Sequence, residues 1–110
     1  MQSAYVEAEM NVLASAMIDS NTLHDVIPVV EVNDFTIQSH KIIYKNIIEL
    51  FEKGSPIDLI TVANKVNSSV DVSYLAQLVD SIPSSAKASH YAQIIKQNAI
   101  RRSLIEASNQ

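Results

Sequence analysis

Residues 84–110 contain no glycine, no proline and no cluster of turn-forming residues, so they are predicted to form one long helix. Ser84 and Ser85 follow Pro83 and provide candidate N-caps for it, but nothing like a C-cap occurs before Gln110. At about 1.5 Å per residue such a helix would span roughly 40 Å, more than the width of a small domain. We therefore expect an interaction module that belongs to a longer protein, with part of this helix contacting something outside its own domain.

The apolar face of this helix changes direction along its length. At 100° per residue, one face of the first half carries only apolar side chains, and Arg102 and Glu106 occupy the same face further along. The apolar residues of the second half, Ile100, Leu104 and Ala107, point to the other side. A protruding helix that contacts another helix or subunit would explain this pattern, and so would a helix packed between two parts of one head. The apolar residues of the first-half face are Ala88, Tyr91, Ala92, Ile95 and Ala99.

The rest of the chain also has helical periodicity. No segment alternates apolar and polar residues over a useful length, and Val29–Val32 is the best candidate for a strand. The helix at residues 39–53 has the widest apolar face, so we expect it to be central and most buried. The fold class is therefore all-α, a small bundle of about five short helices followed by the long one. The five short helices are predicted at residues 6–18, 22–27, 39–53, 59–66 and 71–80, with Gly54 as a C-cap and Asp58 as an N-cap.

Composition excludes several functions. The single glycine, Gly54, rules out a P-loop or a dinucleotide-binding turn, each of which needs several glycines in one short segment. A net charge of −4 and 5% aromatic residues argue against a nucleic-acid surface. The absence of cysteine fits a reducing cytoplasm, and neither a signal peptide nor a membrane span is recognisable. No enzyme chemistry is indicated, and no metal or cofactor site is expected.

The remaining candidate residues have simpler structural explanations. His40 lies beside the apolar face of its helix and is expected to be a hydrogen-bonded structural histidine, while His24 and His90 are too far away in sequence to suggest a zinc site. Glu7 and Glu9 suit the positive end of the first helix dipole. Tyr74 is either a core residue or a hydroxyl presented to a partner. The adjacent Arg101 and Arg102 are either solvated or bind an acidic group.

Four segments, in order and spacing, resemble the N-terminal domain of DnaB-type hexameric replicative helicases of bacteria and phages. The resemblance covers nearly the whole chain. It departs from the family at Ala14 and at Val70–Ser73, where the family often has glycine. The segments are Glu7–Glu9 with Val12, Leu13 and Met17; Asp34–Phe35 with His40, Ile43 and Tyr44; Gly54–Val62; and Tyr74–Leu78 continuing through Ile82–Ala86 and Tyr91–Ile95 to Ala99–Ile105.

The resemblance implies a helical head at residues 1–83 and, at residues 84–110, the first helix of a truncated helical hairpin. Family members pair through their hairpins into a collar of three dimers, which receives the primase C-terminal domain and, as a further candidate, a helicase loader. The ring encircles single-stranded DNA, while the ATPase motor, with ATP and Mg²⁺, is absent from this fragment. A free-standing helical adaptor or DNA-binding regulator is the alternative. The expected interface residues are Tyr91, Ile94, Ile95, Ile100, Leu104 and Ile105, and Glu7 and Tyr74 are candidates for responding to primase.

Overall fold

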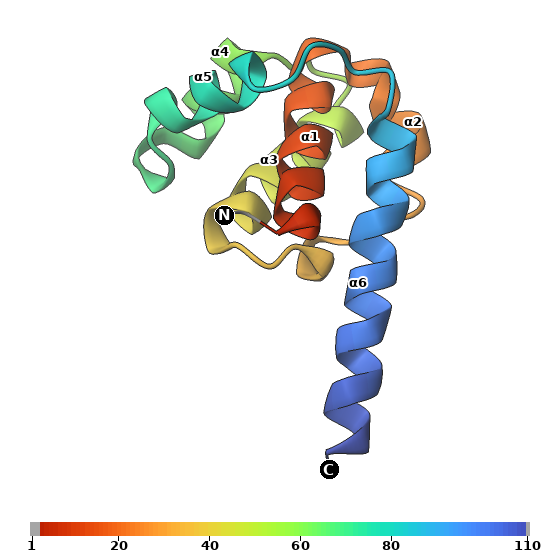
Figure 1. The fold of residues 1–110 in the computed structure, drawn as a ribbon. Coiled ribbons are helices and arrows are strands. Elements are labelled where there is room, and N and C mark those ends of the chain that lie inside the picture. Colours follow the sequence, from red (N-terminus) through yellow and green to blue (C-terminus); the bar gives the residue numbers. More distant parts are fainter. Residues whose placement is uncertain (1–2, 110) are drawn as a thin grey trace.

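A computed structural model describes residues 3–109 and contains six α-helices and three single-turn 3-10 helices (Figure 1). No strand occurs among the described residues, so the predicted all-α fold is confirmed, and Val29–Val32 is not a strand. The α-helices are α1 (Ala4–Ile18), α2 (Leu23–Val26), α3 (Gln38–Glu52), α4 (Leu59–Val66), α5 (Val72–Asp80) and α6 (Ala88–Ser108). The 3-10 helices are η1 (Ser20–Thr22), η2 (Val32–Asp34) and η3 (Asn67–Ser69).

The central helix is α1, and the prediction that residues 39–53 form the most buried helix is wrong. Helix α1 packs against α3, α5 and α6 and is buried on almost every side (Figure 1). Residues 11–17 contain no charged side chain, which is the sequence signal for a helix enclosed on all faces. Helix α3 has a broad apolar face, but it buries only His40, Ile43, Tyr44 and Ile47 fully.

The predicted helix ends in the middle of the chain are confirmed. Asp58 caps α4 through a reciprocal pair of hydrogen bonds with Thr61, each of 2.9 Å. Gly54 follows α3 with a φ of 69°, a left-handed conformation that glycine adopts without steric cost. Asp71 caps α5, accepting a hydrogen bond from the amide of Ser73 at 3.0 Å. These local interactions fix the boundaries of the α4–α5 pair, which forms its own edge of the head (Figure 1).

Helix α6 begins at Ala88 rather than at the predicted Ser84. The Ser84 hydroxyl accepts a hydrogen bond from the Ala86 amide, forming a local turn that competes with helix formation. The first half of α6 packs along α1, and the second half then extends away from the head (Figure 1). The helix ends at Ser108; Gln110, the last residue of the predicted helix, lies outside the described residues, as do Met1 and Gln2.

Within residues 3–109, no helix combines the length and the apolar character that crossing a lipid bilayer would require.

Candidate protein-interaction surfaces

The second half of α6 exposes three large aliphatic side chains within two turns. Ile100 is 52% exposed, Leu104 66% and Ile105 53%. In the first half, by contrast, Ala92 and Ile95 are buried against α1, so the predicted rotation of the apolar face after Ala99 is confirmed. Single exposed aliphatic residues are common, but a stripe of three on a protruding helix is typical of a protein-contact surface. We call Ile100, Leu104 and Ile105 the α6 stripe.

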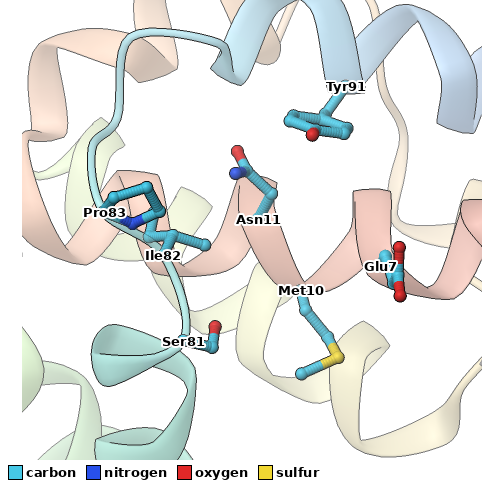
Figure 2. A pocket seen from close by; sticks show the side chains of 7 residues that line it. All are labelled: Glu7, Met10, Asn11, Ser81, Ile82, Pro83 and Tyr91. Atoms are coloured by element: carbon cyan, nitrogen blue, oxygen red, sulfur yellow. The ribbon is translucent and has the colours of Figure 1, made fainter.

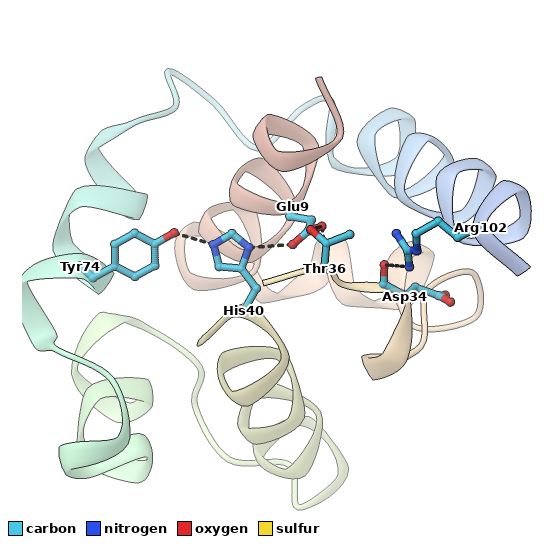
Figure 3. A network of polar contacts seen from close by, with 6 residues as sticks. All are labelled: Glu9, Asp34, Thr36, His40, Tyr74 and Arg102. Atoms are coloured by element: carbon cyan, nitrogen blue, oxygen red, sulfur yellow. Dashed lines mark hydrogen bonds and ion pairs between the residues drawn. The ribbon is translucent and has the colours of Figure 1, made fainter. Parts of the chain in front are cut away.

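Two basic side chains fix the direction of α6. Arg102 donates a hydrogen bond from Nη2 to the backbone carbonyl of Asp34 at 3.0 Å (Figure 3). Lys96 Nζ lies 3.1 Å from the Asp34 carboxylate. Asp34 Oδ2 also accepts a hydrogen bond from the Glu31 amide, which holds the η2 turn in shape. The protruding half of α6 is therefore tied to η2 on one side, while the α6 stripe stays free on another.

A buried polar network joins α1, α3 and α5 (Figure 3). His40 Nδ1 lies 2.8 Å from Glu9 Oε1, and His40 Nε2 is hydrogen bonded to the Tyr74 hydroxyl. The other carboxylate oxygen of Glu9 accepts hydrogen bonds from the amide of Thr36 at 2.9 Å and from its hydroxyl at 2.6 Å. His40 is thus the hydrogen-bonded structural histidine that the sequence predicts. Its ring is 0% exposed, so it cannot reach a substrate, and the network serves to join helices.

The network holds Glu9 in its ionised form. Burial by itself would raise the pKa of Glu9, but the hydrogen bonds from His40 and Thr36, with the charge interaction with His40, bring that pKa below its ordinary value. An ionised carboxylate can only accept hydrogen bonds, so His40 must carry a proton on Nδ1 to donate to Glu9. In the neutral ring Nε2 is then unprotonated and accepts the hydrogen bond from the Tyr74 hydroxyl. Burial and the nearby Glu9 charge also raise the pKa of the Tyr74 hydroxyl, which therefore stays protonated and can donate.

A cleft of about 290 Å³ lies between α1 and α6, closed at one end by the connection between α5 and α6 (Figure 2). Asn11 of α1 and Tyr91 of α6 project into it, and Ile82 and Pro83 line the closed end, while Glu7 lies towards the other end. Small-molecule pockets usually measure about 300–1,000 Å³. The cleft lies at the lower end of this range and has room for a single side chain.

The residues predicted as interface or partner-responsive sites fall into four environments. The α6 stripe is exposed, whereas Ile94 is half-buried and Ile95 is only 1% exposed, which gives Ile95 no side-chain surface for a partner. Tyr91 and Glu7 line the same cleft although they are far apart in sequence. Tyr74 is half-buried at a different place, with its hydroxyl bonded to His40. The α6 stripe and the cleft are thus separate candidate surfaces.

A model of the family described as DnaB-like helicase N terminal domain matches residues 1–97 of the chain. The chain belongs to this family. Among the replicative DNA helicases DnaB, it is 34% identical to that of Leifsonia xyli subsp. xyli over 106 residues and 31% identical to that of Buchnera aphidicola over 110 residues. These matches cover 91% and 94% of the chain, but only 23% and 24% of the two relatives. The chain thus spans about a quarter of their length.

The fold of the DnaB-like domain is also that of a solved relative. The crystal structure of the N-terminal domain of DnaB helicase from Mycobacterium tuberculosis matches it with a TM-score of 0.89 and 29% sequence identity. The match covers 94% of this chain and 80% of the crystallised one. The fold of the head and of the beginning of α6 is therefore shared with this member of the family.

Three polar residues of this DnaB-like domain were not recognised from the sequence as structurally important. Glu9, which the helix dipole appeared to explain, is 1% exposed and forms the centre of the buried network. Asn11 points into the α1–α6 cleft, and Arg102 holds α6 to η2. For Glu9 and Asn11 the available sequence signal was the run of uncharged residues that follows them in α1. Such a run indicates a helix that is enclosed on all faces, so polar side chains on it are expected to be buried.

Proposed function

We propose that this domain is the non-catalytic N-terminal tier of a replicative DNA helicase, where it mediates assembly of the ring and docks partner proteins. The observation that carries the proposal is the α6 stripe, which lies on a projecting helix half whose direction is fixed by the hydrogen bond from Arg102 to Asp34. An exposed stripe that is fixed in direction can meet a neighbouring helix without a further ordering cost.

The assembly surface consists of the α6 stripe, with the half-buried Ile94 at its flank, whereas Tyr91 lines the α1–α6 cleft. Its occupants would be the second helix of a hairpin and the same helix of a second copy, giving dimers that combine in threes into a hexamer. Each large aliphatic side chain that becomes fully buried contributes about 1.5–3 kcal/mol, so three per copy can stabilise a dimer.

The head is the proposed docking site for the primase C-terminal domain and for a helicase loader. Glu7 is exposed at the α1–α6 cleft and could contact a partner directly. Tyr74 would respond indirectly, through the packing of α5, because its hydroxyl is engaged by His40. Single-stranded DNA would be reached only through the complete ring.

The chemistry of unwinding would lie in a motor domain that binds ATP and Mg²⁺. The residues of this chain do not fit that role, because its single glycine cannot build a phosphate-binding loop. Among residues 3–109, no group of three or more acidic or histidine side chains is arranged to hold a metal ion.

The proposal is tested with Ile100→Asp and Leu104→Asp introduced together into the helicase that carries this domain. We expect the hexamer to dissociate, as measured by light scattering, because two charges would be placed in an apolar interface. The stimulation of unwinding by primase should fall as well. Ile60→Asp is the matched control, since Ile60 is 78% exposed on α4, away from the stripe. A double variant that keeps its hexamer and its response to primase would show that the α6 stripe is not the assembly surface.

A further inference from the structure

The cleft between α1 and α6 contains polar groups that have no partner within the described residues. Glu7 is exposed and takes part in none of the three ion pairs of residues 3–109. Asn11 is only 9% exposed, and its Oδ1 accepts a hydrogen bond from the Ser15 hydroxyl at 3.1 Å. The Asn11 amide nitrogen is then left with two N–H donors directed towards the cleft (Figure 2). The cleft therefore offers one anionic acceptor and one neutral donor.

The other walls of the cleft are mainly apolar, and the one further polar side chain, Ser81, donates its hydroxyl hydrogen to the Leu78 carbonyl at 2.7 Å. Met10 on α1 faces the same opening as Ile82 and Pro83, and the ring of Tyr91 lies above them on α6 (Figure 2). Thioether and aromatic surfaces accept the aliphatic part of a long side chain, and an aromatic face also attracts a cation. A ligand that suits all the walls has an apolar stem, a positive end and a hydrogen-bond acceptor near its base.

We propose that this cleft binds an arginine side chain presented by a segment of a partner protein. The guanidinium group pairs with the Glu7 carboxylate and stacks on Tyr91, the methylene groups lie against Met10, and the backbone carbonyl of the arginine accepts from the Asn11 amide. This inference deepens the proposed docking role of the head and rests on it, and it assigns the chemistry that the cleft recognises.

Charge and geometry favour arginine over other residues. Among the described residues that line the cleft, Glu7 is the only charged one, so an acidic side chain would be repelled and a neutral one would leave the carboxylate unpaired. A guanidinium group forms two parallel hydrogen bonds with a carboxylate and stacks on aromatic rings, whereas the ammonium of lysine is a strongly hydrated point charge. The volume of about 290 Å³ accommodates one long side chain.

The test is an NMR titration of the ¹⁵N-labelled 110-residue chain with N-acetyl-arginine amide. N-acetyl-citrulline amide is the comparison probe, because it has nearly the same shape but no charge. We expect saturable shifts confined to the amides of the cleft, with citrulline binding about tenfold more weakly, which corresponds to about 1.4 kcal/mol. Equal binding of the two probes, shifts scattered over the surface, or no shifts at the solubility limit would each overturn the proposal.

Two variants assign the binding to the cleft. Glu7→Gln should weaken arginine binding about tenfold and remove the advantage over citrulline, because the charge-assisted hydrogen bonds are lost. Glu52→Gln is the matched control, an exposed glutamate on α3 away from the cleft, and should bind as the unaltered chain does. The same spectra report whether each variant is folded. Unchanged binding by Glu7→Gln would refute the assignment.

The outcome is separable from that of the assembly proposal. Ile100→Asp with Leu104→Asp alters the α6 stripe, which does not line the cleft, and arginine binding should survive in that variant. If the stripe variant keeps its hexamer while the cleft binds arginine, the assembly role fails and the recognition chemistry stands. If the stripe variant dissociates while the cleft ignores arginine, the reverse holds.

Discussion

His40 Nδ1 lies 2.8 Å from Oε1 of Glu9, and both side chains are essentially removed from solvent, at 0% and 1% exposed. The pair joins α3 to α1, and the Tyr74 hydroxyl extends the link to α5 (Figure 3). Polar groups at such a depth are costly unless each has a partner, and here each one is hydrogen bonded. The three helices are consequently held in one arrangement, because any slip would leave a buried charge unpaired.

His40→Ala should lower the free energy of unfolding by about 3–5 kcal/mol, since it leaves the Glu9 carboxylate buried without its main partner. Urea denaturation followed by circular dichroism measures the change. Lys65→Ala is the control, because it breaks a partly exposed ion pair with Glu49 of 3.3 Å and should cost no more than about 1 kcal/mol. Equal losses for the two variants would show that the buried pair has no special importance.

Acid should destabilise the domain partly through Glu9. The pKa of Glu9 in the folded state lies below its ordinary value of 4.5, so the unfolded chain binds the proton more tightly. The contribution of Glu9 is complete above pH 4.5 and is lost as the pH falls through the lowered folded-state value. Urea midpoints measured from neutral pH into acid should therefore fall less steeply for Glu9→Gln than for the unaltered chain. Parallel curves would contradict this assignment.

Tyr74→Phe should loosen α5 without unfolding the head. Removing the hydroxyl leaves the Nε2 atom of His40 without its partner, at a cost of about 1–3 kcal/mol. Amide hydrogen exchange should then accelerate in α5 more than in α4, because the lost bond is the polar link between α5 and the centre of the head. Val72→Ala is a suitable control, since Val72 is 57% exposed at the start of the same helix. Equal acceleration in both variants would show that the hydroxyl link does not hold α5 in place.

The sequence predicted those features that depend on neighbours along the chain. Gly54 ends one helix and Asp58 begins the next through contacts within three residues. The change in direction of the apolar face along α6 follows from helical geometry alone. The centre of the bundle was predicted wrongly, because the enclosure of α1 depends on which helices surround it. Contacts such as Glu9 with His40 join residues that periodicity cannot relate.

The candidate surfaces were predictable to different degrees for the same reason. The α6 stripe could be predicted from a single helix. The cleft could not, because it exists only where Glu7 and Tyr91 are brought together by the packing of α6 on α1. Ile95 has the right residue type for an interface, but tertiary packing places it in the core instead.

Arg102→Ala should release the protruding half of α6 from the η2 turn. The hydrogen bond from Arg102 Nη2 to the Asp34 carbonyl spans 3.0 Å and, among the described residues, is the hydrogen bond furthest along α6 that joins it to the head. Its loss should cost about 1 kcal/mol locally, which corresponds to roughly a fivefold faster exchange of the amides beyond Arg102. Hydrogen exchange measured by NMR resolves this effect residue by residue.

Arg101→Ala is the matched control for that experiment, because Arg101 is the exposed neighbour with the same charge and helix propensity, and its side chain makes no hydrogen bond to the rest of the described chain. It should leave the exchange rates of α6 nearly unchanged. If the domain assembles through the α6 stripe as proposed, Arg102→Ala should also weaken that assembly more than Arg101→Ala does, because an α6 stripe that is no longer fixed in direction must be ordered on binding. Identical behaviour of the two variants would mean that Asp34 does not orient α6.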